Sequence, residues 1–111
     1  MDIYKLINNN YVLVDYIKSD DEIDKETLQK IRQRYSEIEE IKLHRQKLNG
    51  ENINEYNEYN AYVELCRAEG KSKKLINAEK LALTEEIEIG TDIIQKIRVI
   101  KWKINILIDL V

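Results

Sequence analysis

The chain contains no proline and only three glycines, so few positions can end a helix. Gly50, Gly70 and Gly90 follow one another at intervals of 20 residues, and a glycine costs about 1 kcal/mol in a helix interior. These glycines therefore divide the chain into candidate helices. One helical domain is expected over residues 1–111, because domains of roughly 100–150 residues already bury about two thirds of the unfolded chain's surface.

The first long candidate helix runs from about residue 20 to Asn49. Acids at its start complement the positive end of the helix dipole, and Leu28, Ile31 and Tyr35 recur at helical spacing. Asn49 and Gly50 form a typical C-terminal stop. This segment is therefore predicted to be one amphipathic helix.

Two further helices are expected on either side of Gly70, over residues 52–70 and 72–90. The apolar side chains that share a helical face are Tyr56, Tyr59, Val63 and Cys66 in the first segment and Ile76, Leu83 and Ile87 in the second. Each predicted helix would be about 26–28 Å long.

Both ends of the chain permit two interpretations. Residues 91–111 carry a 4-3-4-3-4 apolar spacing typical of a coiled-coil seam, at Ile93, Ile97, Ile100, Ile104, Leu107 and Val111. From Ile100 to Leu110 apolar and polar residues also alternate as in a half-buried strand. A helix is the prediction, and a short β element near the C-terminus is the alternative.

The N-terminal residues are similarly ambiguous. Apolar side chains and one asparagine hold a 4-3-4-3 helical spacing, at Ile3, Ile7, Asn10, Val14 and Ile17. The alternative is a turn at residues 8–10 between a short helix and a strand over residues 11–17. With a helix preferred here as well, the expected fold class is an all-α bundle of three to five antiparallel helices with coiled-coil character.

Composition excludes several classes of protein. Apolar residues make up 43% and charged residues 35%, which is too apolar for general disorder, and no run approaches the ~18 apolar residues of a membrane span. A single cysteine cannot form an internal disulfide, and the N-terminus lacks a secretion signal, so a cytoplasmic location is expected. The abundance of Ile, Lys, Asn and Tyr resembles an AT-rich coding sequence, as in many phages and plasmids.

No residue pattern indicates catalysis or a bound metal. His44 is the sole histidine and Cys66 the sole cysteine, so a zinc site has almost no ligands available. Neither the serines nor the acidic run near residue 20 stands in a catalytic or calcium-binding motif. We therefore expect a protein that is not an enzyme, with no cofactor and no small-molecule substrate.

Basic residues gather near the C-terminus around the single tryptophan. Single-strand-binding proteins combine cations for the phosphates with aromatic rings for the bases. The nucleic-acid-binding candidates are Lys96, Arg98, Lys101, Trp102 and Lys103. The alternative is a solvated helix face beside a packed tryptophan.

Two other groups are candidates for a protein interface. A period-three repeat places Tyr56, Tyr59 and Tyr62 on one slowly spiralling stripe, and tyrosine is enriched at interfaces. The acids Asp20, Asp21 and Glu22 belong to the first 70 residues, which carry 15 acids against 10 bases. Core packing is the alternative for the tyrosines, and helix capping is the alternative for the acids.

The chain resembles the phage recombination-mediator family typified by UvsY. The resemblance lies in Asp21, Ile23, Asp24 and Leu28, in Arg34-Tyr35, in a tyrosine-containing segment ending at Gly70-Lys71, and in a closing apolar segment from Ile87 to Leu110. It implies a helical homo-oligomer that binds single strands and helps to load a recombinase.

Two functional hypotheses follow for a non-catalytic, oligomeric binding protein. The first is a phage or mobile-element protein that assists recombination or replication by binding single-stranded nucleic acid and a protein partner. The second is a small phage-type inhibitor of a host defence system, similar to an anti-CRISPR protein, which acts by protein–protein binding. Neither hypothesis involves a membrane.

Overall fold

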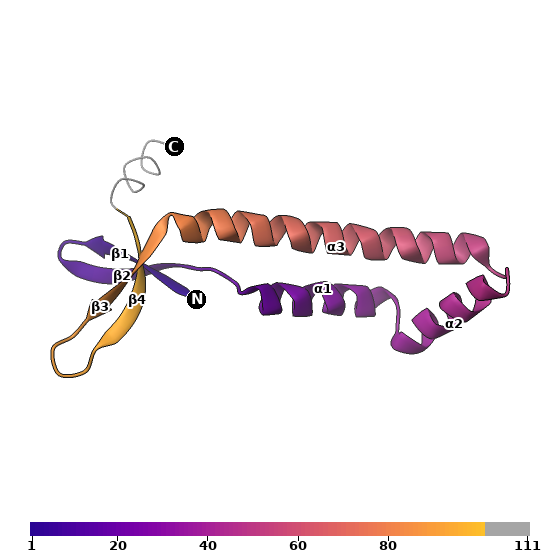
Figure 1. Cartoon of the computed structure of the whole chain (residues 1–111), viewed down its shortest axis with the longest axis horizontal. Helices are drawn as coiled ribbons and strands as arrows, with labels where there is room; N and C mark the ends of the chain where they lie inside the picture. The colour runs from indigo at the N-terminus through magenta and orange to yellow at the C-terminus, as the bar shows by residue number, and fades with distance from the viewer. Residues whose placement is uncertain (102–111) are drawn as a thin grey trace. The chain divides into compact units, whose positions relative to one another are not determined.

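The computed structural model describes residues 1–101 (Figure 1). These residues form two compact units. The sheet unit consists of Met1–Ser19 together with residues 75–101, and the helical unit consists of Asp20–Lys74. The predicted all-α bundle is wrong, because three helices are combined with a four-stranded mixed sheet in an α+β fold.

The N-terminal residues form a hairpin of β1 (Asp2–Ile7) and β2 (Asn10–Tyr16) in place of the predicted helix. The connecting residues Asn8 and Asn9 have φ values of 49° and 65°, and a two-residue turn with positive φ at both positions matches the twist of the strands it joins. Asparagine reaches this region more readily than most residues. The two asparagines therefore end β1 at a point where the apolar spacing still permitted a helix.

In the helical unit, α1 (Asp20–Arg34) and α2 (Glu37–Leu48) replace the single helix predicted over residues 20–49. The predicted acidic start and the stop at Asn49-Gly50 are confirmed. The interruption is a capping box in which the Glu39 N–H donates to Ser36 Oγ at 3.1 Å and the Ser36 N–H donates to the Glu39 carboxylate. This pair of bonds stabilises a new helix start in the middle of a continuous apolar pattern.

The predicted helix break at Gly70 is also wrong, because α3 (Ile53–Ala82) runs through it. Gly70 is buried, and a Cβ placed on it would lie 2.6 Å from Thr27 Oγ1 of α1. The absence of a side chain thus allows α1 and α3 to approach closely. This glycine serves helix packing and does not terminate the helix.

The core of the helical unit is largely aromatic. Ring centroids of Tyr35 and Tyr59 lie 5.0 Å apart in an edge-to-face arrangement, which is favourable for aromatic pairs. The buried side chains that make up this core are Ile31, Leu43, Tyr56, Tyr59, Val63 and Cys66.

Residues 72–90 were predicted as a third helix. They are helical only to Ala82, where α3 ends, and continue as β3 (Thr84–Ile89). An antiparallel partner, β4 (Gln95–Ile100), follows where a fourth helix was predicted over residues 91–111. Residues 102–111 of that prediction lie outside the described residues. Gly90 has a φ of 103° at the turn, a conformation that glycine adopts readily.

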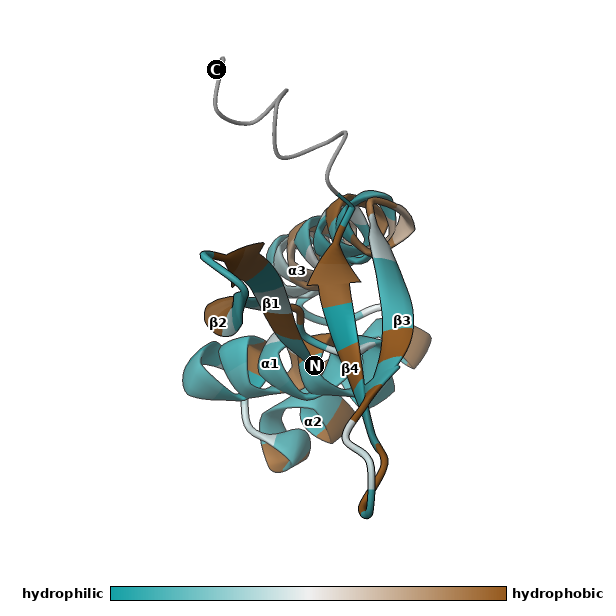
Figure 2. Ribbon diagram, turned by 90° about the vertical axis from the view of Figure 1, so that its left-hand side faces the viewer, coloured by the Kyte–Doolittle hydropathy of each residue, from teal (hydrophilic) through white to brown (hydrophobic). Residues whose placement is uncertain are grey.

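The strands form one sheet in the order β2-β1-β4-β3. Two parallel residue pairs, Ile3 with Arg98 and Tyr4 with Val99, join the N-terminal hairpin to the C-terminal hairpin. Figure 2 shows alternating hydrophilic and hydrophobic bands along β3 and β4. Such alternation places two different sets of side chains on the two faces of a sheet.

One face of the sheet lies toward the end of α3, where Ile3, Ile17 and Thr84 line a pocket together with Lys80 and Leu83. Ile3 and Thr84 are buried on this face, as is Ile17 directly after β2. Lys80 of α3 forms an ion pair with Asp15 at 4.0 Å. The sheet unit therefore has its own small core beneath the end of α3.

The turn between β1 and β2 gives a first prediction. The substitution Asn9→Val should lower the free energy of unfolding by about 1–2 kcal/mol, because a β-branched residue is strained at positive φ. Asn9→Gly should leave it within about 0.5 kcal/mol, since Asn-Gly suits this turn. Urea unfolding followed by circular dichroism measures both values, and an equal loss in the two variants would contradict the turn assignment.

The contact between Gly70 and Thr27 gives a second prediction. Gly70→Ala should lower the free energy of unfolding by about 1 kcal/mol, because overpacking costs roughly 1–3 kcal/mol and exceeds the gain in helix propensity of about 1 kcal/mol. In a Thr27→Ala background the same change should become stabilising by up to about 1 kcal/mol. A double-mutant cycle by urea unfolding measures this reversal, and additive effects would contradict the close approach.

Candidate functional site

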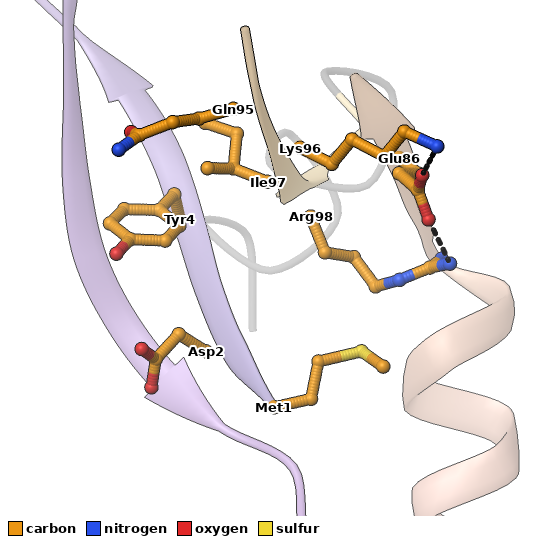
Figure 3. Close-up of a pocket in the computed structure, with 8 residues that line it drawn as sticks. All are labelled: Met1, Asp2, Tyr4, Glu86, Gln95, Lys96, Ile97 and Arg98. Atoms are coloured by element: carbon orange, nitrogen blue, oxygen red, sulfur yellow. Dashed lines mark ion pairs between the residues drawn. The ribbon is translucent and has the colours of Figure 1, made fainter. Parts of the chain in front are cut away.

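The predicted nucleic-acid-binding residues Lys96 and Arg98 lie on β4, and both pair with one acid (Figure 3). Glu86 of β3 is 3.8 Å from Lys96 Nζ and 3.9 Å from Arg98 Nη2. Arg98 also donates a hydrogen bond to Thr84 Oγ1 at 3.2 Å. One carboxylate thus offsets part of the positive charge that a phosphate backbone would use.

Beside these residues the sheet holds a cavity of about 530 Å³. It is lined by Met1, Asp2 and Tyr4 at the start of β1 and, among others, by Glu86, Lys96 and Arg98 across from them (Figure 3). The strands β1 and β4 are paired only at Ile3 and Tyr4. The cavity therefore lies where two parallel strands separate, and its lining mixes both signs of charge.

The remaining candidates near the C-terminus are only partly described. The Lys101 backbone N–H donates to the Leu83 carbonyl at 3.2 Å, which places Lys101 at the end of β4. Trp102 and Lys103 lie outside the described residues. The structure therefore brings Lys96 and Arg98 together, and single-strand binding by the whole group stays a prediction.

The tyrosine stripe lies mainly in the helical core. Tyr56 and Tyr59 are buried, and the Tyr62 hydroxyl donates to the Lys30 carbonyl at 3.1 Å. The Arg34 guanidinium carbon is 4.6 Å from the Tyr62 ring centroid, within cation–π range. Packing within the unit thus accounts for the two buried rings.

Tyr59 has a strongly perturbed hydroxyl. Burial, together with a hydrogen bond of 2.8 Å to Glu40 Oε1, raises the pKa of Tyr59 to about 12. Arg32 forms an ion pair with the same carboxylate at 2.9 Å. This network connects α1, α2 and α3 and holds Tyr59 in its neutral form.

The acidic candidates occupy the first turn of α1, where Asp20 and Asp21 are exposed and Glu22 is half-buried. Acids at this position stabilise a helix through its dipole. One turn further on, Asp24 accepts a hydrogen bond from Lys74 of α3 at 2.7 Å, and this bond raises the pKa of Lys74. A structural role is therefore sufficient for the three acids.

The sheet carries an apolar surface that was not predicted from the sequence, which we call the open face. It is the side opposite α3, and the strand register brings Tyr4 against Leu13 and Leu6 against Tyr11. The exposed members Leu6, Tyr11, Leu13 and Tyr16 keep between 40% and 56% of their surface accessible, and Tyr4, Ile87 and Ile97 beside them are half-buried.

The signal for the open face was present in the sequence. Apolar and aromatic residues recur at every second position in Tyr4, Leu6, Tyr11 and Leu13, which is the period of a strand. The same residues also fit a helical spacing, and the helix predicted from that spacing does not place these four side chains on one face.

Neither a metal site nor a membrane-spanning helix is found in the described part of the chain. Among residues 1–101, no group of three or more His, Cys, Asp and Glu side chains is placed to hold a metal ion. No helix within the same residues is long and apolar enough to span a membrane.

No protein-family model, curated protein or solved structure matches this chain. The resemblance to recombination mediators consequently stays a prediction.

The raised pKa of Tyr59 gives a third prediction. Unfolded tyrosine titrates near pH 10, so the neutral phenol stabilises the folded state fully below about pH 10, and that contribution is lost as the pH rises toward about 12. Tyr59→Phe should therefore reduce the fall in unfolding free energy between pH 9 and 12. Urea unfolding across this range measures the difference, with Tyr11→Phe at an exposed tyrosine as control; identical pH profiles for wild type and Tyr59→Phe would contradict it.

Proposed function

We propose that this protein acts without catalysis, by binding a protein partner through the open face. The observation that carries the proposal is the set of exposed apolar side chains on neighbouring strands, namely Leu6, Tyr11, Leu13 and Tyr16. In the register of β1 and β2, Leu6 is opposed by Tyr11 and Leu13 by Tyr4, and the one charged residue beside the set is Asp2, opposite Tyr16. Contiguous apolar patches of this kind mark interaction sites more often than isolated exposed residues do.

The composition of the open face fits a protein ligand. Aromatic residues are enriched and charged residues depleted at the centre of protein interfaces, and the Tyr4–Leu13 and Leu6–Tyr11 pairs are both uncharged and each contain one aromatic ring. Fully burying an exposed leucine contributes roughly 1.5–3 kcal/mol, and Leu6 and Leu13 keep 50% and 56% of their surface accessible. The partner is accordingly expected to present aliphatic and aromatic side chains.

The chemistry of the open face also favours a protein over a nucleic acid. Affinity for nucleic acid comes mainly from cations that contact phosphates. The bases Lys96 and Arg98 lie on the opposite face of β4 from Ile97 and Val99, and both pair with Glu86. Of the two functional hypotheses, protein–protein binding is therefore the one we retain.

Photo-crosslinking followed by titration tests the proposal. Benzoylphenylalanine in place of Leu6 should capture a discrete protein in cells of the source organism, and the same residue in place of Ile38 should not. Ile38 is 79% exposed in α2 and provides a matched apolar control. The captured protein is then purified and titrated by calorimetry, where Leu6→Glu should raise Kd at least tenfold, which is about 1.4 kcal/mol, and Ile38→Glu should not.

Two results would overturn the proposal. One is an unchanged Kd for Leu6→Glu with the purified partner. The other comes from fluorescence anisotropy of a labelled oligo-dT, if binding weakens steeply with salt, is lost in Arg98→Glu and persists in Leu6→Glu. That second pattern would assign the sheet to single-strand binding.

A further inference from the structure

The outer side of β2 is an edge that no strand within residues 1–101 covers. β2 is the terminal strand in the order β2-β1-β4-β3, and all seven of its residues are exposed. Natural proteins usually protect such edges with charges, prolines or short strands. β2 has a single charged residue, Asp15, which lies near its end and pairs with Lys80.

We propose that two copies of this chain associate by pairing their β2 strands antiparallel, so that two sheets continue as one. This inference concerns the strand edge and does not depend on the proposed function of the open face. A second copy is the occupant because β2 is complementary to itself in backbone hydrogen bonding, in side chains and in charge.

The hydrogen-bonding register follows from the hairpin. Ile7 and Asn10 close the two-residue turn and are opposed in the ladder, so they form a hydrogen-bonded pair, and such pairs alternate with non-hydrogen-bonded pairs along antiparallel strands. Val12, opposite Lys5, therefore directs its backbone N–H and C=O toward β1. Tyr11 and Leu13 direct theirs outward.

These outward groups match those of a second β2 when the two-fold axis passes beside Val12. Tyr11 then exchanges both of its backbone hydrogen bonds with Leu13 of the second copy, and symmetry repeats the exchange, giving about four bonds. The irregularity in β2 between Leu13 and Asp15, and the Tyr16 N–H bound to Asp15 Oδ1 at 2.8 Å, end the pairing segment beyond Leu13.

Side chains agree with the same register. Tyr11 would stand opposite Leu13 of the second copy on the open face, an aromatic–aliphatic pair that stabilises sheets. Val12 would stand opposite Val12 of the second copy on the other face. No acid faces an acid, because Asp15 lies outside the paired segment.

The opposite edge of the sheet, β3, is not suited to pairing with a copy of itself. β3 carries Glu85, Glu86 and Glu88 within six residues. Two copies of β3 would bring these carboxylates together, and like charges on opposed strands are destabilising. The sheet thus has one acidic edge and one edge able to accept a copy of itself.

A cysteine at the two-fold axis tests the register directly. Opposed residues of a non-hydrogen-bonded pair have Cα atoms about 4.5 Å apart, within the range that a disulfide spans. Val12→Cys should therefore form a covalent dimer under oxidised glutathione. Tyr16→Cys, on the same strand and about equally exposed, should stay monomeric. Cys66 is buried at 2% exposure and does not compete.

Sedimentation equilibrium tests the association without a crosslink. Wild type should shift from 13.2 kDa toward twice that mass as concentration rises. Val12→Lys should weaken the dimer at least tenfold, since it places two ammonium groups together, while Val12→Thr should retain it. Unchanged circular dichroism in both variants controls for folding.

The proposal is overturned if wild type stays at 13.2 kDa up to millimolar concentration while the Tyr11 and Leu13 amides exchange freely. A dimer that Val12→Lys does not weaken, or equal crosslinking of Val12→Cys and Tyr16→Cys, would also overturn it. Binding of a protein partner through Leu6 is measured in a separate titration, so failure of the dimer proposal does not decide the proposed function, and the reverse also holds.

Discussion

The sheet depends on the parallel pairing of β1 with β4 through Ile3, Tyr4, Arg98 and Val99. Each hairpin alone would be a two-stranded ribbon, which is only marginally stable in water. Their junction buries Ile3 and Val99 at the centre of the sheet and aligns apolar residues of four strands on the open face. The same junction decides which strands become edges, and it leaves the cavity where the two central strands separate.

Local signals in the sequence predicted part of this fold correctly. The acidic start of α1 and the Asn49-Gly50 stop act within one helical turn, so they can be read without knowing the tertiary structure. Gly70 could not be interpreted in this way, because its role depends on Thr27, which is 43 positions earlier in the chain. In residues 2–17 the apolar pattern permitted both a helix and strands, and the two-residue turn at Asn8 and Asn9 favours the hairpin. The pairing of β1 with β4 joins segments far apart in the chain and has no local signal.

For the candidate sites too, the sequence indicates which residues are of interest, whereas their partners depend on the tertiary structure. The tyrosines were predicted as an interface from their residue type, and Tyr56 and Tyr59 lie on the helix face that packs against α1 and α2. Lys96 and Arg98 were predicted as a site from their charge. Their shared partner Glu86 could not be predicted, because it is brought beside them only by the register of β3 and β4. The exposed apolar residues of the open face alternate along β1 and β2, but they form one surface only when the register of this hairpin places them on the same side.

The long separation along the chain between β1 and β4 has a consequence for folding during synthesis. Ile3 and Arg98 are 95 positions apart, and ribosomes add about 5–20 residues per second. The first hairpin therefore waits roughly 5–20 s for its central neighbour, with both of its edges unpaired. Residues 20–74, which form the compact helical unit, are synthesised during this interval. Until β4 has been made, the nascent N-terminal hairpin is thus open to strand pairing on both sides.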